Sequence, residues 1–182
     1  MSDVMIPSNY TGPYAIDPAH SHIGFAVRQA AVSTVVGSFR DFAGSGYFDA
    51  DSPPRSCVSL AIDAASIDTG NGRRDAHLRG NAFLEVDRYP TITFISTSVE
   101  GLSTSGYRVS GALTIRHVTE PVAVTLECTG ATIETSGNPR IWLEGTTIIR
   151  RRDWGLTGNA AADLLIGRQA TLRLEVAAAR TQ

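Results

Sequence analysis

The stretch Ser66–Pro90, SIDTGNGRRDAHLRGNAFLEVDRYP, lacks the alternation of apolar and polar residues that surrounds it on both sides. Its polar start suits a helix, because the side chains of Asp68, Thr69 and Asn71 can accept a hydrogen bond from a first-turn amide. Asp75 and Arg79 are four residues apart, with the acid nearer the N-terminus, and this order favours a helix. A short polar helix is marginal in water and needs tertiary contacts. We therefore predict one helical insertion near residues 71–80, laid as a plug over one end of a β structure. Its expected anchors are the apolar residues beside it: Ile67, Phe83 and Leu84.

Alternating apolar residues dominate the chain outside this insertion. In residues 57–63, CVSLAID, every second side chain is a large apolar one, which is typical of a strand with one buried face. Residues 22–28 and 122–128 follow the same pattern. About eight such runs, separated by turn residues, predict an all-β fold in which antiparallel strands close into an extended barrel. The interior of such a barrel is filled by its own side chains or holds one small ligand.

Length and composition fit one globular unit. The chain has 182 residues, of which 42% are hydrophobic and 19% charged, and this length supports a sizeable core. In this interpretation residues 1–11 form a flexible N-terminal tail and residues 12–182 a single domain. The net charge of −2 argues against a nucleic-acid partner, which would favour a basic face.

The N-terminus predicts the compartment of the protein, and the compartment predicts the state of its two cysteines. The first ten residues, MSDVMIPSNY, lack the basic and apolar regions of a signal peptide. No apolar run reaches the roughly 18 residues of a membrane helix. We therefore expect a cytoplasmic protein that is not integral to a membrane. There, Cys57 and Cys128 are expected to be buried thiols rather than a disulfide.

Seven motifs, in order along the chain, resemble one known family. They are YAIDPAHSHIGFAV (Tyr14–Val27), VGSF (Val36–Phe39), SIDTG (Ser66–Gly70), RDAHLR (Arg74–Arg79), YPTITF (Tyr89–Phe94), GALTIR (Gly111–Arg116) and RRDWG (Arg151–Gly155). This combination is similar to the YceI-like family of lipocalin-like polyisoprenoid-binding proteins. The resemblance implies a lipocalin-like barrel that is usually dimeric, with a tunnel for a long isoprenoid or related lipid. It implies a binding protein without a cofactor, not an enzyme.

The candidate lipid-binding residues are apolar side chains at the inward phase of the strands. They are Phe25, Val27, Phe39, Leu60, Ile62, Phe94, Val109 and Leu113, with Phe83 and Trp154 near a mouth. Guanidinium groups match phosphate well, so Arg74 and Arg151, together with His77, are the candidates for contact with a lipid head group. An apolar tunnel discriminates by length and shape, which leaves a polyprenyl phosphate, an isoprenoid quinone and a fatty amide open as ligands. The protein would act as a carrier, store or sequestering agent.

Two other classes of function stay open. His20 and His22 share a face of a strand and can meet one metal ion, which would suit a histidine-dependent enzyme. A hydrolase would combine Asp17, His20 and Ser21, although three residues this close in sequence rarely form a triad. A barrel with a filled core would instead be a structural or stress-related dimer without a ligand.

Overall fold

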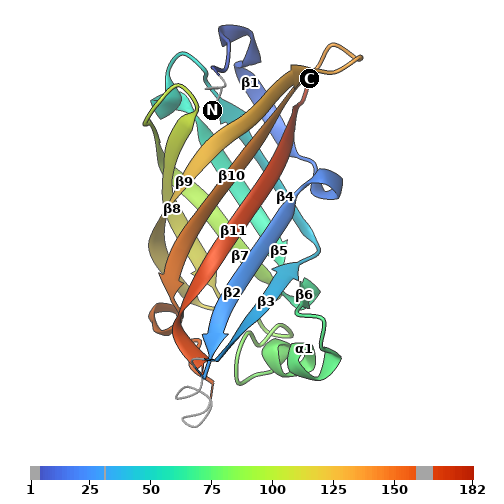
Figure 1. Ribbon diagram of the computed structural model, residues 1–182, viewed down its shortest axis with the longest axis vertical. Helices are drawn as coiled ribbons and strands as arrows, with labels where there is room; N and C mark the ends of the chain where they lie inside the picture. Colours follow the sequence, from blue (N-terminus) through green and yellow to red (C-terminus); the bar gives the residue numbers. More distant parts are fainter. Residues whose placement is uncertain (1–4, 31, 159–165) are drawn as a thin grey trace.

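The computed structural model describes residues 5–30, 32–158 and 166–182. Within them, eleven strands form one antiparallel sheet, and eight of these close into a barrel (Figure 1). The strands of the barrel are, in order around it, β1 (Gly12–Ile16), β4 (Phe42–Phe48), β5 (Cys57–Asp63), β7 (Thr91–Gly101), β8 (Gly106–Ile115), β9 (Val118–Ile133), β10 (Pro139–Arg150) and β11 (Ile166–Arg180). The barrel closes between β1 and β11, where Tyr14 lies opposite Arg180. The predicted all-β antiparallel barrel is therefore confirmed.

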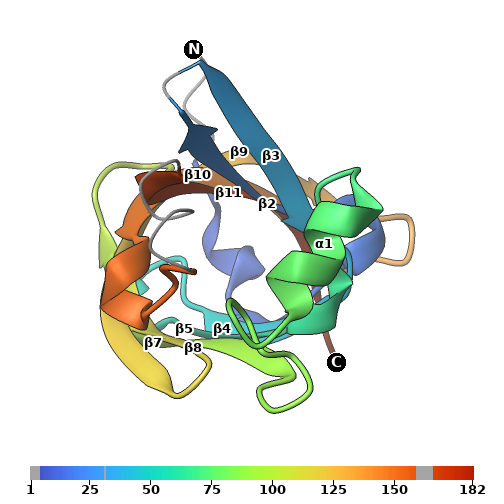
Figure 2. The same ribbon diagram turned by 90° about the horizontal axis from the view of Figure 1, so that it is seen from below.

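Three further strands extend the sheet beyond the ring: β2 (His22–Gln29), β3 (Ser33–Phe39) and β6 (Ile67–Asp68). β2 pairs with the same edge of β11 as β1 does, using Ile166–Glu175 where β1 uses Ala178–Arg180. Between β1 and β2, the short 3-10 helix η2 (Pro18–His20) interrupts the edge, because proline has no backbone N–H to donate to a strand partner. The β2–β3 hairpin extends past the ring of strands (Figure 2).

The predicted helix is present as α1 (Gly72–Arg79), at one end of the barrel (Figures 1 and 2). The side chain of Asn71 accepts a hydrogen bond from the Arg74 amide at 3.0 Å, as expected for the residue before the first turn. The predicted pairing of Asp75 with Arg79 is wrong. Buried Asp75 accepts hydrogen bonds from the amide and the hydroxyl of Thr69, and Arg79 donates to backbone carbonyls of residues 65 and 67. Both side chains thus tie the helix to the preceding loop.

Four short 3-10 helices complete the described secondary structure: η1 (Ser8–Tyr10), η3 (Pro53–Arg55), η4 (Ala64–Ser66) and η5 (Arg151–Trp154). The described residues include no helix that is both long and apolar enough to cross a membrane.

Two apolar clusters occupy the two ends of the barrel. The helix-end cluster lies beside α1 and contains Ile23, Ile62, Ala64, Ile67, Leu84, Ile92, Leu113, Ile115, Ile149, Trp154, Leu156 and Ala170. The N-terminal-end cluster contains Ile6, Tyr10, Tyr14, Tyr107, Cys128, Ile141 and Ala178. Because Ile6 and Tyr10 are each only 6% exposed, the expectation of a loose tail before Gly12 is corrected for residues 5–11, which pack onto this end of the barrel.

Candidate functional site: an apolar cavity in the barrel

A cavity of about 160 Å³ lies between the two end clusters. It borders Ile23 and Leu60 on the helix-end side and Tyr14, Tyr107 and Ile141 on the other. Every strand of the eight-stranded ring contributes to the lining, and none of the lining residues is charged. This lining is therefore suited to an apolar ligand.

The distribution of side-chain sizes explains why the space lies in the middle. Val99, Val109 and Val124 form the central apolar layer, and Val58 packs against them. The interior of an eight-stranded barrel is just wide enough for side chains to fill, and valine is too short to reach across it. Both ends carry larger rings, such as Trp154 at one and Tyr10, Tyr14 and Tyr107 at the other.

The predicted lipid-binding residues divide between the cavity and the helix-end cluster. Leu60, Phe94 and Val109 line the cavity. The remaining seven belong to the packed helix-end cluster or lie against it: Phe25, Val27, Phe39, Ile62, Phe83, Leu113 and Trp154. The Trp154 indole N–H donates to the Leu113 carbonyl at 3.0 Å. The sequence thus identified inward-facing residues, but most of them touch one another rather than open space.

The three head-group candidates lie away from the cavity lining. Arg74 donates from Nε to the Thr69 hydroxyl at 2.8 Å, and His77 is exposed on α1. Arg151 is only 2% exposed and donates from Nε to the Gly167 carbonyl at 2.7 Å. Arg151 therefore holds η5 against the start of β11, and none of the three groups reaches the cavity.

The sequence interpretation missed the aromatic wall at the N-terminal end. Tyr14, Phe48 and Tyr107 line the cavity there, and the rings of Phe48 and Tyr107 meet edge to face with centroids 5.6 Å apart. Tyr107 begins the alternating run of β8, so its inward phase was visible in the sequence. Its place in the cavity wall depended on strand pairing that no local pattern shows.

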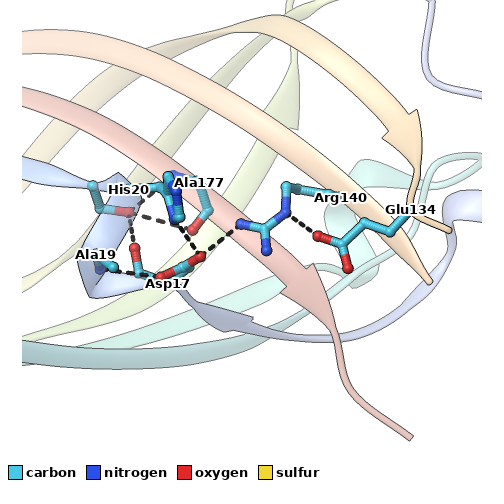
Figure 3. A network of polar contacts seen from close by, with 7 residues as sticks. Asp17, Ala19, His20, Glu134, Arg140 and Ala177 are labelled. Carbon is cyan, nitrogen blue, oxygen red and sulfur yellow. Dashed lines mark hydrogen bonds and ion pairs between the residues drawn. The ribbon is translucent and has the colours of Figure 1, made fainter. Parts of the chain in front are cut away.

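The residues of the suspected hydrolase form a structural network (Figure 3). The His20 Nδ1 atom lies 2.8 Å from an Asp17 carboxylate oxygen. The Ser21 hydroxyl, however, donates to the Asp17 carbonyl at 2.7 Å and accepts from the Ala177 amide at 2.9 Å. Because a serine nucleophile must hydrogen-bond its histidine base, this arrangement is not a catalytic triad. The network instead ties the η2 segment, which separates β1 from β2, to the neighbouring strand β11.

A charged pair extends the same network to β10. Arg140 donates to the Asp17 carboxylate at 2.8 Å and also pairs with Glu134 (Figure 3). The Arg140 and His20 hydrogen bonds lower the pKa of Asp17 to about 2. Among the described residues, no three His, Cys, Asp or Glu side chains are grouped to hold a metal ion.

The two cysteines differ in their surroundings. Both are free thiols, and Cys128 is buried as predicted. Cys57 is exposed, which corrects the prediction, because it occupies the outward phase of β5, one residue before inward-facing Val58. Burial raises the pKa of the Cys128 thiol.

Known proteins share both the sequence pattern and the barrel. Residues 14–178 match the YceI-like domain. The chain belongs to the YceI-like family. It is 36% identical over 146 residues to a UPF0312 protein of Ectopseudomonas mendocina, covering 79% of this chain and 76% of the relative. A UPF0312 protein of Yersinia pestis is 38% identical with the same coverage.

Solved structures share the fold. BcnA of Burkholderia cenocepacia superposes with a TM-score of 0.81 at 20% identity, covering 89% of this chain and 98% of BcnA. The YceI protein of Campylobacter jejuni gives 0.76 at 27% identity, with 83% and 88% covered. A polyisoprenoid binding domain from Saccharophagus degradans gives 0.68 at 19% identity, with 93% and 98% covered.

Proposed function

We propose that this protein binds a long-chain isoprenoid or a related lipid in the barrel cavity and acts as a carrier, store or sequestering agent rather than as an enzyme. The observation that carries the proposal is the uncharged cavity of about 160 Å³ inside a closed barrel. The Saccharophagus degradans domain of the same fold is described as polyisoprenoid binding, and we extend that ligand class to this chain. A homodimer and a cytoplasmic location remain predictions from the sequence.

The chemistry of the walls favours a chain over a compact polar ligand. Each buried CH₂ contributes about 0.8 kcal/mol, from which the cost of ordering the chain is subtracted. An apolar cavity of about 150 Å³ takes a molecule the size of benzene. The present cavity therefore holds a short part of the chain, and the rest of a longer ligand has to extend beyond it.

Mass spectrometry of lipids extracted from the purified protein identifies the ligand. We expect a molecule with a prenyl or other long apolar chain in the wild-type extract. The matched test is substitution by tryptophan at two inward positions of β5. Leu60 borders the cavity, whereas Ile62 lies in the helix-end cluster.

Leu60→Trp should fill the cavity, abolish lipid binding and leave the melting temperature near that of wild type. Ile62→Trp overpacks a filled region, which typically costs 1–3 kcal/mol, yet it should retain binding under conditions where the protein is folded. Ile95→Trp adds the same bulk to an outward position that is 57% exposed and serves as the control. Undiminished lipid binding by Leu60→Trp would contradict the proposed site.

A further inference from the structure

Four residues of the cavity lining also belong to the helix-end cluster or pack against it. They are Ile23, Leu60, Phe94 and Leu174. Phe94 and Leu174 pack in addition against the central valine layer, so they lie where the cavity meets the packed end of the barrel. These side chains form the floor of the cavity, and Phe94 is the largest of the four.

Phe94 and Leu174 reach this floor from opposite walls of the barrel. In the order of strands around the ring, β7 is the fourth and β11 the eighth, which is half of the circumference apart (Figure 2). The interior of an eight-stranded barrel is only just wide enough for side chains to fill. A phenyl ring on one wall and a leucine on the other are therefore able to close it.

The Phe94 ring leans toward the cavity because the neighbouring strand carries a glycine there. Leu113 of β8 is the cross-strand partner of Phe94, and Gly111 is the next inward position of β8 on the cavity side. A Cβ atom at Gly111 would lie only 2.5 Å from Cζ of the Phe94 ring and 2.8 Å from its Cε2. Any other residue at position 111 would thus compete with the ring for this space.

The space below the floor is occupied by the helix-end cluster. Ile62, Leu113 and Trp154 are buried there. An apolar chain that enters from the N-terminal-end side meets Phe94 and goes no deeper while the ring stays in place. Truncation of a large core side chain leaves a void that the surroundings fill only in part. Removal of the Phe94 ring should therefore open room for about one more prenyl unit of the chain.

We propose that Phe94 determines the length of lipid chain that the cavity accepts, by closing its floor together with Leu174. This inference rests on the proposed lipid-binding function and adds a residue that sets its specificity. Each chain unit above the floor adds buried apolar surface, and hence affinity. Units beyond that length stay outside the cavity and add little.

The test measures the dissociation constants of prenol, geraniol, farnesol and geranylgeraniol, which share one end group and differ stepwise by one prenyl unit. The affinity of the wild-type protein should rise with chain length and then level off. Phe94→Ala should move this point by about one prenyl unit. It should also bind the longer alcohols at least about tenfold more tightly than wild type, because each buried CH₂ is worth about fourfold in affinity, less the cost of ordering the chain.

Two further variants control for the loss of packing. Phe25→Ala removes the same side chain from the helix-end cluster, outside the cavity lining, and should keep the length dependence of wild type. Phe94→Leu is a milder truncation, which should raise the affinity for the longer alcohols relative to the shorter ones. Thermal unfolding identifies the conditions in which each variant is folded, and Phe94→Leu decides the test if Phe94→Ala does not fold.

A folded Phe94 variant with the length dependence of wild type would overturn the inference, as would the same shift in Phe25→Ala. A wild-type affinity that rises by an equal factor with every added unit up to geranylgeraniol would also overturn it, since no floor would then limit the chain. In these cases the proposed function stands, because the prenyl alcohols bind. Failure of the wild-type protein to bind any of the four alcohols would overturn the inference and the proposed function together.

Discussion

Asp17 stabilises the joint between β1 and β2 through its negative charge. It accepts hydrogen bonds from Arg140 and His20, which hold its pKa at about 2, below the ordinary value of 3.8. A carboxylate with a lowered folded-state pKa contributes stability that is complete above the unfolded-state pKa and is lost as the pH falls through the folded-state value. Stability from Asp17 should therefore decline between about pH 4 and pH 2.

Asp17→Asn should lower the free energy of unfolding at pH 6 by about 1 kcal/mol, allowing for partial solvent screening of the site. The difference from wild type should shrink as the pH approaches 2. Urea unfolding at pH 6 and at pH 2.5 measures both quantities. Substitution of the exposed Asp41 by asparagine is the control. A difference between wild type and Asp17→Asn that is independent of pH would show that the charge of Asp17 is not responsible.

Single residues also show the limit of what the sequence predicts. Alternation correctly placed Leu60 and Ile62 on the inner face of β5, but it does not reveal which of them borders open space. That depends on the sizes of side chains brought in from other strands, such as Val99 and Val124 around the cavity and Trp154 in the helix-end cluster. The alternation that shows which side chains point inward is a property of one strand, whereas a cavity depends on the side chains of every strand around it.

At the scale of elements, α1 depends on contacts outside itself. Asp75 is 5% exposed and accepts two hydrogen bonds from Thr69. Asp75→Ala should remove both and leave the Thr69 donors without their partner, at a cost of about 1–3 kcal/mol. Hydrogen exchange should then increase first in residues 69–90 and only later in the barrel strands. Asp87→Ala, an exposed position in the same segment, is the control, and equal loss of protection in all strands would contradict a separable plug.

The existence of this helix was predictable because a polar, capped segment interrupts otherwise alternating strands. The hydrogen bonds of the helix were not predictable, since Asp75 has two possible partners at short range and the fold favours Thr69 over Arg79. The prediction of a loose N-terminal tail was wrong for a related reason. Ile6 and Tyr10 are too few to form a recognisable pattern, and their burial arises only because the open end of the barrel offers an apolar surface.

For the whole molecule, the motifs predicted the barrel but not how its edge closes. Two separate strands, β1 and β2, share one edge of β11, and this division follows from the break at Pro18. The pairing of β1 with both β4 and β11 joins segments that lie far apart in sequence. Such pairing reflects the closure of the sheet and has no signature in either strand alone.

A closed barrel around a ligand links folding to binding. A ligand that binds only the folded chain stabilises it by about 2.7 kcal/mol when present at 100 times its dissociation constant. For a chain of this length, 1 kcal/mol corresponds to about 2–4 °C in melting temperature, so geranylgeraniol at that concentration should raise the melting temperature by about 5–10 °C. The rise should grow with the logarithm of ligand concentration.

The two tryptophan variants separate this linkage from unspecific effects of lipid on the protein. Ile62→Trp should start from a lower melting temperature and still rise with ligand, because its substitution lies outside the cavity lining. Leu60→Trp should start near wild type and not respond, because its cavity is filled. Calorimetry of the three proteins over a series of ligand concentrations measures the slopes. A similar rise in Leu60→Trp would mean that the stabilising lipid binds somewhere other than the barrel interior.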